Sequence, residues 1–341
     1  MTLDEKMTPE KQSRRAWLFV GLGLVAYYVL IQLFRTLFKI FVSPLTEGMT
    51  GLGADIVSML GTFGVMYFLA QPLSYLVMRI APREKIEEKK LGFGKFLVFF
   101  FVAFFFMFAG AMISLVINAV VSGFTGLSSN ESVSDVFSNV DPILMFAISA
   151  VLGPIAEELL FRKFIIDRTH AFGGTFSVVL SGVMFGLFHG NIQQMIGAAA
   201  AGMLFGYIYL KTGRIRYSII IHIGVNTFAS LVQLFTNKLG LAEISDAATL
   251  GEIPGDVMNT FLALLGSEIV YFCFVVIGIV LFCVYVKEVR IPKGRCELTA
   301  GKNLKSAFLN VGMILYLLLC AYMVVCSFYP NFSLLKFLKI V

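Results

Sequence analysis

The chain has 341 residues, of which 58% are hydrophobic and 14% charged, and its mean hydropathy is +0.86. Because a soluble globular domain carries about 25% charged residues, this composition excludes an ordinary soluble protein. The net charge of +6 would suggest a nucleic-acid partner in a soluble protein. In a membrane protein it is better explained by basic loops at one membrane face, so we expect no nucleic acid.

Apolar runs long enough to cross a bilayer recur along the chain. About 20 apolar residues cross the hydrocarbon core as a helix, and these runs lack the short alternating pattern of a membrane β-barrel. We predict an all-α, polytopic integral membrane helix bundle of about nine transmembrane helices, or eight if one is re-entrant. The predicted spans are residues 16–42, 55–80, 96–121, 142–162, 175–190, 194–210, 216–236, 260–286 and 306–329.

Lysine and arginine are concentrated in alternate loops. Basic loops face the cytoplasm by the positive-inside rule. With nine spans, the rule places the N-terminus in the cytoplasm and the C-terminus outside, in what we expect to be a bacterial cell membrane. The basic segments are the N-terminal tail and residues 79–95, 162–168, 211–216 and 287–305, whereas loops 43–54, 122–141 and 237–257 together hold only Lys238.

The fourth predicted span ends in three charged side chains, Glu157, Glu158 and Arg162. A charge at the centre of a membrane helix costs ~2.5–3.5 kcal/mol, so such residues are functional candidates. Glu158 and Arg162 are four residues apart and share a face, which permits an intrahelical ion pair. Glu157 is turned ~100° from Glu158 and needs another partner or a polar cavity. The alternative is that both glutamates lie at the membrane interface and reach into water.

The chain has three histidines. We expect His170, which follows the fourth span, to be exposed to solvent. His189 and His222 lie within or beside apolar spans, with Phe185 and Asn226, respectively, one helical turn away. A single helical histidine is more often a packing residue. Two imidazoles on separate helices, beside a carboxylate pair on a third, are the groups of a hydrolytic site.

Small residues recur every four positions along the fifth and sixth spans. This spacing allows membrane helices to approach closely, and close packing would also fix the geometry of a site between them. The two rows are Gly182, Gly186 and Gly190, and Ala198, Gly202 and Gly206.

Three motifs in this region resemble those of the CAAX protease and bacteriocin-processing family. The family includes the type II CAAX prenyl proteases and the lysostaphin-resistance-A-like proteins. The motifs occur in order on separate predicted helices, and the resemblance covers about residues 142–236. They are Glu157-Glu158-x-x-x-Arg162, Phe185-x-x-x-His189 and His222-x-x-x-Asn226.

The resemblance implies an intramembrane endopeptidase, a hydrolase whose partners are the lipid bilayer and a membrane-associated peptide or protein. By this analogy Glu157 is the general base that activates a water molecule, and Glu158 with Arg162 orients it. His222 and Asn226 would stabilise the oxyanion.

The resemblance leaves open whether a metal ion takes part. His189 would hold either the attacking water or a metal. A carboxylate and two imidazoles, here Glu157, His189 and His222, would suit zinc. The same residues could also activate water without a metal.

We divide the chain into N-terminal transmembrane helices (1–141), a catalytic core (142–236) and C-terminal transmembrane helices (237–341). Two other function classes remain. One is a non-catalytic membrane scaffold or bacteriocin self-immunity protein that binds a peptide in the same cavity. The other is a transporter, which is disfavoured because the chain lacks paired halves. Retention of every reactive group favours the peptidase.

The depths of the candidate residues disagree if the spans are taken as predicted. Glu157 and His222 lie near basic residues and so near the cytoplasmic side. His189 lies ~18–20 Å into its helix. The depths agree only if the 164–176 segment lies partly in the membrane or if the fourth helix runs deeper than these spans place it. We expect the site to open to the cytoplasmic half.

Overall fold

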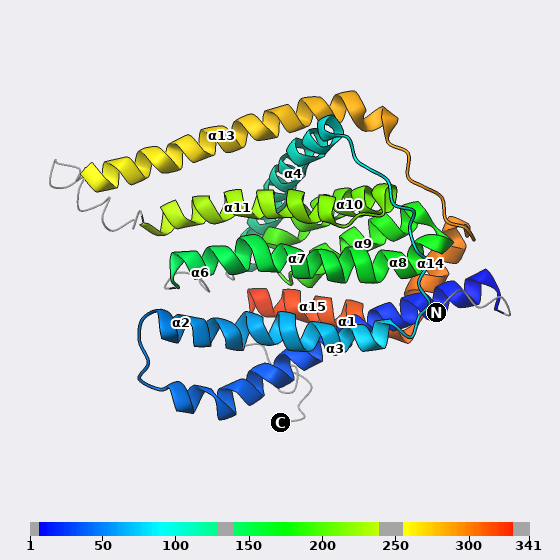
Figure 1. Ribbon diagram of the computed structural model, residues 1–341, viewed down its shortest axis with the longest axis horizontal. Coiled ribbons are helices and arrows are strands. Elements are labelled where there is room, and N and C mark those ends of the chain that lie inside the picture. Colours follow the sequence, from blue (N-terminus) through cyan, green and yellow to red (C-terminus); the bar gives the residue numbers. More distant parts are fainter. Residues whose placement is uncertain (1–6, 128–139, 239–254, 330–341) are drawn as a thin grey trace.

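The computed structural model describes residues 7–127, 140–238 and 255–329, and this part of the chain is helical, without strands (Figure 1). It contains eight helices long and apolar enough to cross a membrane, which confirms the polytopic all-α prediction. The fifth predicted span is the shorter helix α9 (Gly174–Phe188), whose 15 residues extend ~22 Å. The eight longer helices are Pro9–Phe41, Leu52–Met78, Phe93–Thr125, Pro142–Phe172, Ile192–Thr212, Arg216–Thr236, Val257–Glu288 and Val311–Phe328.

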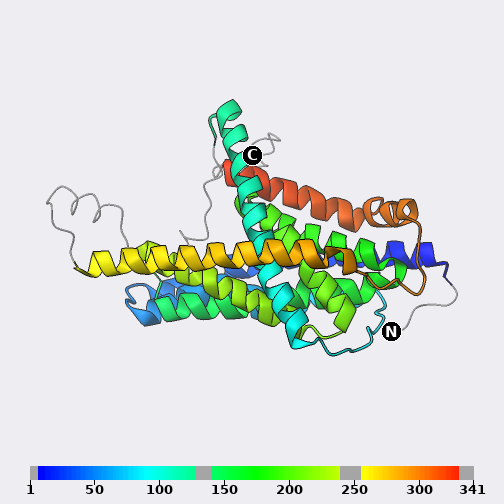
Figure 2. The same cartoon turned by 90° about the horizontal axis from the view of Figure 1, so that it is seen from above.

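The helices pack in three groups (Figures 1 and 2). Helix α1 (Pro9–Phe41) contacts α3 (Gln71–Met78) and the C-terminal helices α14 (Ala300–Phe308) and α15 (Val311–Phe328). In the centre, α9 and α10 (Ile192–Thr212) form a hairpin that α4 (Phe93–Thr125) crosses obliquely. On the far side, α13 (Gly255–Tyr285) packs on α4 and on α11 (Arg216–Lys238).

Glycine brings the two arms of the central hairpin together. A Cβ on Gly182 would lie 2.6 Å from the backbone nitrogen of Met203, and one on Gly186 would lie 2.3 Å from the carbonyl oxygen of Met195. Neither position on α9 can therefore hold a larger residue without separating the helices. The close packing predicted from the small-residue rows is confirmed.

The fourth transmembrane helix is irregular, alternating between α and π geometry. Its segments are α6 (Pro142–Phe146), η3 (Ala147–Leu152, π), α7 (Gly153–Glu158), η4 (Leu159–Ile166, π), α8 (Asp167–Thr169) and η5 (His170–Phe172, 3₁₀). The second helix contains a similar π stretch, η2 (Leu60–Ala70), between α2 (Leu52–Met59) and α3.

The fourth helix continues to Phe172 rather than ending at residue 162 as predicted. Its polar extension is buried because its side chains find partners in the protein. Arg168 donates to the carbonyls of Met78 (2.8 Å) and Phe164 (2.9 Å), and Thr169 donates to that of Ile165 (3.0 Å).

The longer helix removes the disagreement in depth. Glu157 and His189 are each 15 residues from the 172–174 connection, one on each side of it. At 1.5 Å per residue both are ~22 Å from that connection.

The prediction that His170 is exposed is wrong. The side chain is buried, and its Nδ1 lies 2.7 Å from the carbonyl oxygen of Ile166. The basic 287–305 loop covers this turn, since the amide of Cys296 donates to the carbonyl of Ala171 at 2.8 Å. Sequence position alone does not reveal a loop that folds back over a helix end.

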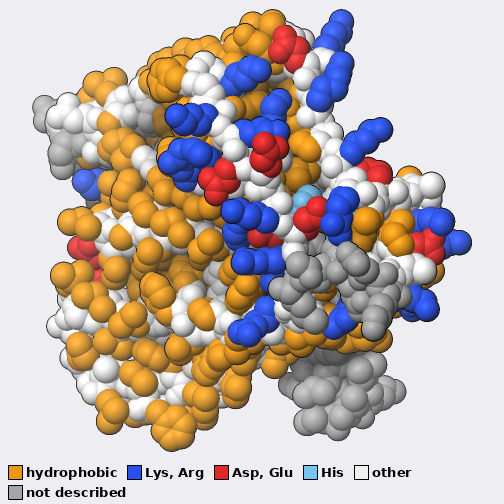
Figure 3. Space-filling view, turned by 45° about the vertical axis from the view of Figure 1, so that its right-hand side comes forward, with side chains coloured by type: hydrophobic (Ala, Val, Ile, Leu, Met, Phe, Trp, Pro, Cys, Tyr) orange, Lys and Arg blue, Asp and Glu red, His pale blue; other side chains and the backbone are white. Residues whose placement is uncertain are grey.

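Lysine and arginine side chains gather at one end of the molecule, called here the basic end (Figure 3). The segment between α3 and α4 crosses this end and is held by backbone hydrogen bonds. The amide of Glu84 donates to the carbonyl of Asp167 (2.7 Å), and that of Lys89 donates to the carbonyl of Thr212 (2.8 Å). The N-terminal ends of α1, α9 and α11 lie at this end (Figure 1).

Candidate active site

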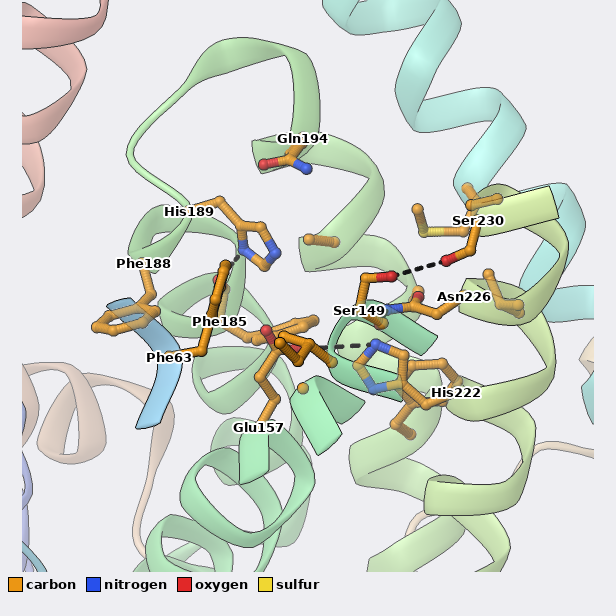
Figure 4. A pocket seen from close by; sticks show the side chains of 18 of the residues that line it. Phe63, Ser149, Glu157, Phe185, Phe188, His189, Gln194, His222, Asn226 and Ser230 are labelled. Atoms are coloured by element: carbon orange, nitrogen blue, oxygen red, sulfur yellow. Dashed lines mark hydrogen bonds and ion pairs between the residues drawn. The ribbon is translucent and has the colours of Figure 1, made fainter. Parts of the chain in front are cut away.

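A cavity of about 520 Å³ lies between the fourth helix, the α9–α10 hairpin and α11. It is lined by Glu157, His189, His222 and Asn226, and by Phe185 from the same sequence motif as His189. Figure 4 shows these side chains turned toward one space from three separate segments. The convergence expected from the motifs is therefore present in the structure.

Glu158 and Arg162 form a fully buried ion pair. Arg162 Nη2 lies 3.3 Å from Glu158 Oε1, and both side chains have no exposed surface. The guanidinium carbon is 4.5 Å from the centre of the Phe185 ring and 5.6 Å from that of Phe205. Aromatic faces attract a cation, most strongly where water is excluded, so the two rings hold Arg162 where few polar atoms are available.

His222 lies between the two glutamates. Its Nδ1 is 3.1 Å from Glu158 Oε1, and its Nε2 is 3.6 Å from Glu157 Oε2. The Phe205 ring stacks on the imidazole at 4.9 Å with an interplanar angle of 29°. Because a carboxylate only accepts hydrogen bonds, the Nδ1–H of His222 donates to Glu158 and Nε2 faces Glu157.

Glu157 differs from Glu158 in its exposure. Its side chain is 26% exposed, whereas that of Glu158 is completely buried. The ~100° turn between adjacent helical residues directs Glu157 into the cavity and Glu158 toward Arg162. The structure thus separates the two carboxylates as the sequence spacing predicts, with Glu158 buried and Glu157 on the wall of the cavity.

His189 is the C-terminal cap of α9 and lines the same cavity. Its Nδ1 is 2.9 Å from the carbonyl oxygen of Phe185. A carbonyl only accepts, so in the neutral ring Nδ1 carries the hydrogen and Nε2 is an acceptor. Asn191 fixes the turn after the histidine by donating to the His189 carbonyl at 3.1 Å.

Asn226 has a backbone partner that the sequence does not suggest. Its Nδ2 donates to the carbonyl of Ser149 at 3.0 Å. In the π segment the amide of Gly153 bonds to the carbonyl of Ile148, five residues earlier. With the same spacing, the carbonyl of Ser149 would accept from the amide of residue 154. That residue is Pro154, which has no N–H, and Asn226 supplies the missing donor.

A second amide supports the same helix from the other side. Gln71, buried on α3, donates to the carbonyl of Ala156 at 2.8 Å. Ala156 immediately precedes Glu157, so this bond fixes the backbone beside the exposed carboxylate. Ser181 on α9 makes a third such contact, to the carbonyl of Phe161 at 2.7 Å.

Sequence reasoning missed Gln71, Ser149 and Phe205. Gln71 stands out as an amide in an apolar span, and Pro154 inside a predicted helix signals a carbonyl that needs another donor. No sequence signal identifies Phe205, because one phenylalanine among 35 is not distinguishable from packing residues.

The candidate zinc ligands are not arranged as a coordination sphere. Among the described residues, which include Glu157, His189 and His222, no group of three or more His, Cys, Asp or Glu side chains could hold a metal ion. Both ring nitrogens of His222 face carboxylates, whereas the Phe185 carbonyl is bonded to only one ring nitrogen of His189, Nδ1. As the described side chains lie, Glu157, His189 and His222 do not form a three-ligand group, and a metal at these residues stays a prediction.

The cavity occupies the half of the bundle away from the basic end. On α11 the lining begins at His222 and continues to Gln233, and on the fourth helix it extends from Glu157 back to Met145. In the predicted orientation this is the outer half of the membrane. The expected opening to the cytoplasmic half depends on that orientation and stays a prediction.

Comparison with known proteins agrees with the motifs. A family profile described as "Type II CAAX prenyl endopeptidase Rce1-like" matches residues 139–228. The chain is 30% identical over 181 residues to "Putative membrane peptidase YdiL" of Bacillus subtilis, an alignment that covers 51% of this chain and 72% of the relative. It is 28% identical over 130 residues to "Membrane-embedded CAAX protease MroQ" of Staphylococcus aureus, covering 36% of this chain and 52% of that protein. No solved structure matches. The chain belongs to the family of CAAX proteases and bacteriocin-processing membrane proteins.

Proposed function

We propose that this protein is an intramembrane endopeptidase that hydrolyses a peptide bond of a membrane-associated peptide or protein. The observation that carries the proposal is the cluster of Glu157, His222, Glu158 and Arg162. Glu157 faces the cavity, with its carboxylate 3.6 Å from the imidazole of His222. The other ring nitrogen of His222 is bonded to Glu158, which forms a fully buried ion pair with Arg162. The names of the similar Bacillus and Staphylococcus proteins support a peptidase.

Glu157 acts as the general base. Its carboxylate takes a proton from a water molecule in the cavity, and the water oxygen attacks the carbonyl carbon of the scissile peptide bond. A positioned general base contributes about 10²–10⁴-fold to such a step. Glu157 is suited to this role because it is the carboxylate that reaches the cavity.

His222 stabilises the charge that develops on the carbonyl oxygen. This role requires a hydrogen on Nε2 in addition to the Nδ1–H that is bonded to Glu158. Its Nε2–H, directed into the cavity, donates to the oxyanion. Asn226 offers its second amide hydrogen to the same atom, because Nδ2 carries two hydrogens and the Ser149 carbonyl accepts only one of them.

His189 positions the attacking water. Its Nε2 is an acceptor in the tautomer fixed by the Phe185 carbonyl, so it accepts one hydrogen of the water while Glu157 removes the other. The tetrahedral intermediate then breaks its C–N bond. The leaving amine receives the proton held by Glu157, and the products are a new carboxyl terminus and a new amino terminus.

The proposal is tested by reconstituting the purified protein in vesicles with a library of apolar membrane peptides and measuring cleavage by mass spectrometry. Wild type should yield products, and Glu157→Gln should reduce their rate of formation by about 10²–10⁴-fold. Equal retention of the same peptides by both proteins, without cleavage by either, would contradict the peptidase and favour a peptide-binding scaffold or immunity protein.

A further inference from the structure

A second cavity, of about 490 Å³, lies between α4, α10 and α13. It is separate from the active site, and α10 forms a wall of both. Leu204 lines the second cavity and its neighbour Phe205 lines the first. On α4, likewise, Phe106 lines the second cavity and Met107 the first.

The wall of this cavity is apolar over most of its length and charged at one end. Val102 on α4 and Phe282 on α13 belong to the apolar part. The charged residues are Lys95 near the start of α4, Lys211 near the end of α10, and Glu288 just after α13. All three lie at helix ends, and the segment that crosses the basic end is bonded beside Lys211, where the amide of Lys89 donates to the carbonyl of Thr212.

The two lysines are available to an anion. The ammonium of Lys211 donates to the hydroxyl of Tyr207 at 2.6 Å and lies 5.0 Å from the centre of that ring. An ammonium has three donors, so two remain for a ligand. No ion pair with a carboxylate involves Lys95 or Lys211 within residues 7–127, 140–238 and 255–329.

We propose that this cavity binds an anionic phospholipid, with its phosphate at Lys95 and Lys211 and one acyl chain in the apolar part. Basic pockets between transmembrane helices on the cytoplasmic side bind anionic lipid headgroups, and the basic end is cytoplasmic by the positive-inside rule. The acyl chain matches the apolar wall and the phosphate matches the two ammonium groups. Glu288 leaves the mouth with one net positive charge and can accept hydrogen bonds from the hydroxyls of a glycerol headgroup.

Other ligands match the cavity less well. A soluble anion such as free phosphate would satisfy the lysines and leave the apolar wall uncovered. A zwitterionic lipid would bring its own cation close to Lys95 and Lys211. Phosphatidylglycerol, whose headgroup carries one negative charge and two hydroxyls, is therefore the probe of choice.

Lipid binding in this cavity should stabilise the position of α10, which also lines the active-site cavity. The ligand would fill the space on one side of α10, and the Phe205 ring that stacks on His222 lies on the other side. We expect the lipid to raise the unfolding temperature of the protein.

The test compares thermal unfolding in nanodiscs of phosphatidylcholine with and without phosphatidylglycerol, together with lipid retention by native mass spectrometry. Wild type should unfold at a higher temperature with phosphatidylglycerol. Each of Lys95→Gln and Lys211→Gln should weaken retention roughly fivefold, since a basic residue near the membrane surface contributes ~1 kcal/mol to binding an anionic lipid. The matched control is Lys90→Gln with Lys293→Gln, two exposed lysines outside the cavity lining.

A further variant, Leu281→Trp, separates loss of lipid binding from a general loss of stability. This substitution fills the apolar part of the cavity and leaves both lysines in place. It should abolish the response to phosphatidylglycerol while unfolding like wild type in phosphatidylcholine. An equal response of wild type to both lipids, an equal response to inorganic phosphate alone, or an undiminished response of the variant that carries both Lys95→Gln and Lys211→Gln would overturn the proposal.

Discussion

The side-chain amide of Asn226 donates to the backbone carbonyl of Ser149 at 3.0 Å, which joins α11 to the helix that carries Glu157. The bond exists because Pro154 cannot supply the amide that the π register requires there. A residue of the third motif thus compensates for a proline just ahead of the first. The two motifs are coupled through a helix defect as well as through the cavity that they share.

Asn226→Ala should destabilise the protein by leaving the Ser149 carbonyl without a donor, at a cost of about 1–3 kcal/mol. Adding Pro154→Ala restores a backbone N–H and should recover part of that loss. Thermal unfolding of both single variants and the double variant measures the coupling. Simple additivity of the two effects would show that the proline and the asparagine are independent.

The two adjacent glutamates should differ in their effect on stability. Glu158→Gln leaves the Arg162 guanidinium buried without a carboxylate, and breaking such a pair costs ~3–5 kcal/mol. Glu157→Gln changes a partly exposed side chain and should unfold near the wild-type temperature. Comparison of detergent-solubilised yield and unfolding temperature tests this. Equal losses in the two variants would remove the distinction between a structural and a reactive carboxylate.

Gln71 should act as a positioning residue from outside the motif region. Gln71→Leu removes the donor to the Ala156 carbonyl, which should cost about 1 kcal/mol of stability. It should also lower peptide cleavage by roughly 10-fold to 100-fold, because small displacements of reacting groups are costly. Ser74→Ala is the matched control, since its hydroxyl donates within α3, to the carbonyl of Gln71. If Gln71→Leu lowers stability but leaves the cleavage rate unchanged, Gln71 contributes to folding and does not position Glu157.

Gly202 should not tolerate a side chain. A Cβ there would lie 3.0 Å from the Phe185 ring and 3.2 Å from Nη2 of Arg162. Gly202→Val should therefore reduce both stability and cleavage, with Gly94→Val on α4 as the control, because a Cβ at Gly94 meets no atom within 4 Å. Normal unfolding of Gly202→Val would contradict the close packing described for this hairpin.

Membrane orientation remains a prediction from the distribution of lysine and arginine. A reporter fused after Pro44 should be external, and one fused after Glu88 should be cytoplasmic. Because the active-site cavity lies away from the basic end, the same experiment decides which half of the membrane holds it. The opposite pattern at both fusions would reverse the assignment.

The fold class and the convergence of the site were predictable from the sequence because both depend on patterns of local spacing. Apolar runs predicted the helices, and four-residue spacing placed Glu158 beside Arg162 and the glycines at the hairpin interface. The π segments, the contact between Asn226 and Ser149, and the burial of His170 depend on neighbours distant in the sequence. Such partners cannot be read from local periodicity, and for that reason the sequence predicts a fourth helix that ends at residue 162, whereas the helix continues to Phe172.

The central claim is that Glu157 and His222 act on the peptide as one catalytic unit. The measurement that tests it most directly is kcat/KM of Glu157→Gln, His222→Gln and the double variant on one cleaved membrane peptide. Residues that act as a unit give strongly non-additive losses, so the double variant should be no slower than the slower single variant. If the two losses multiply, the residues act independently and the proposed mechanism is contradicted.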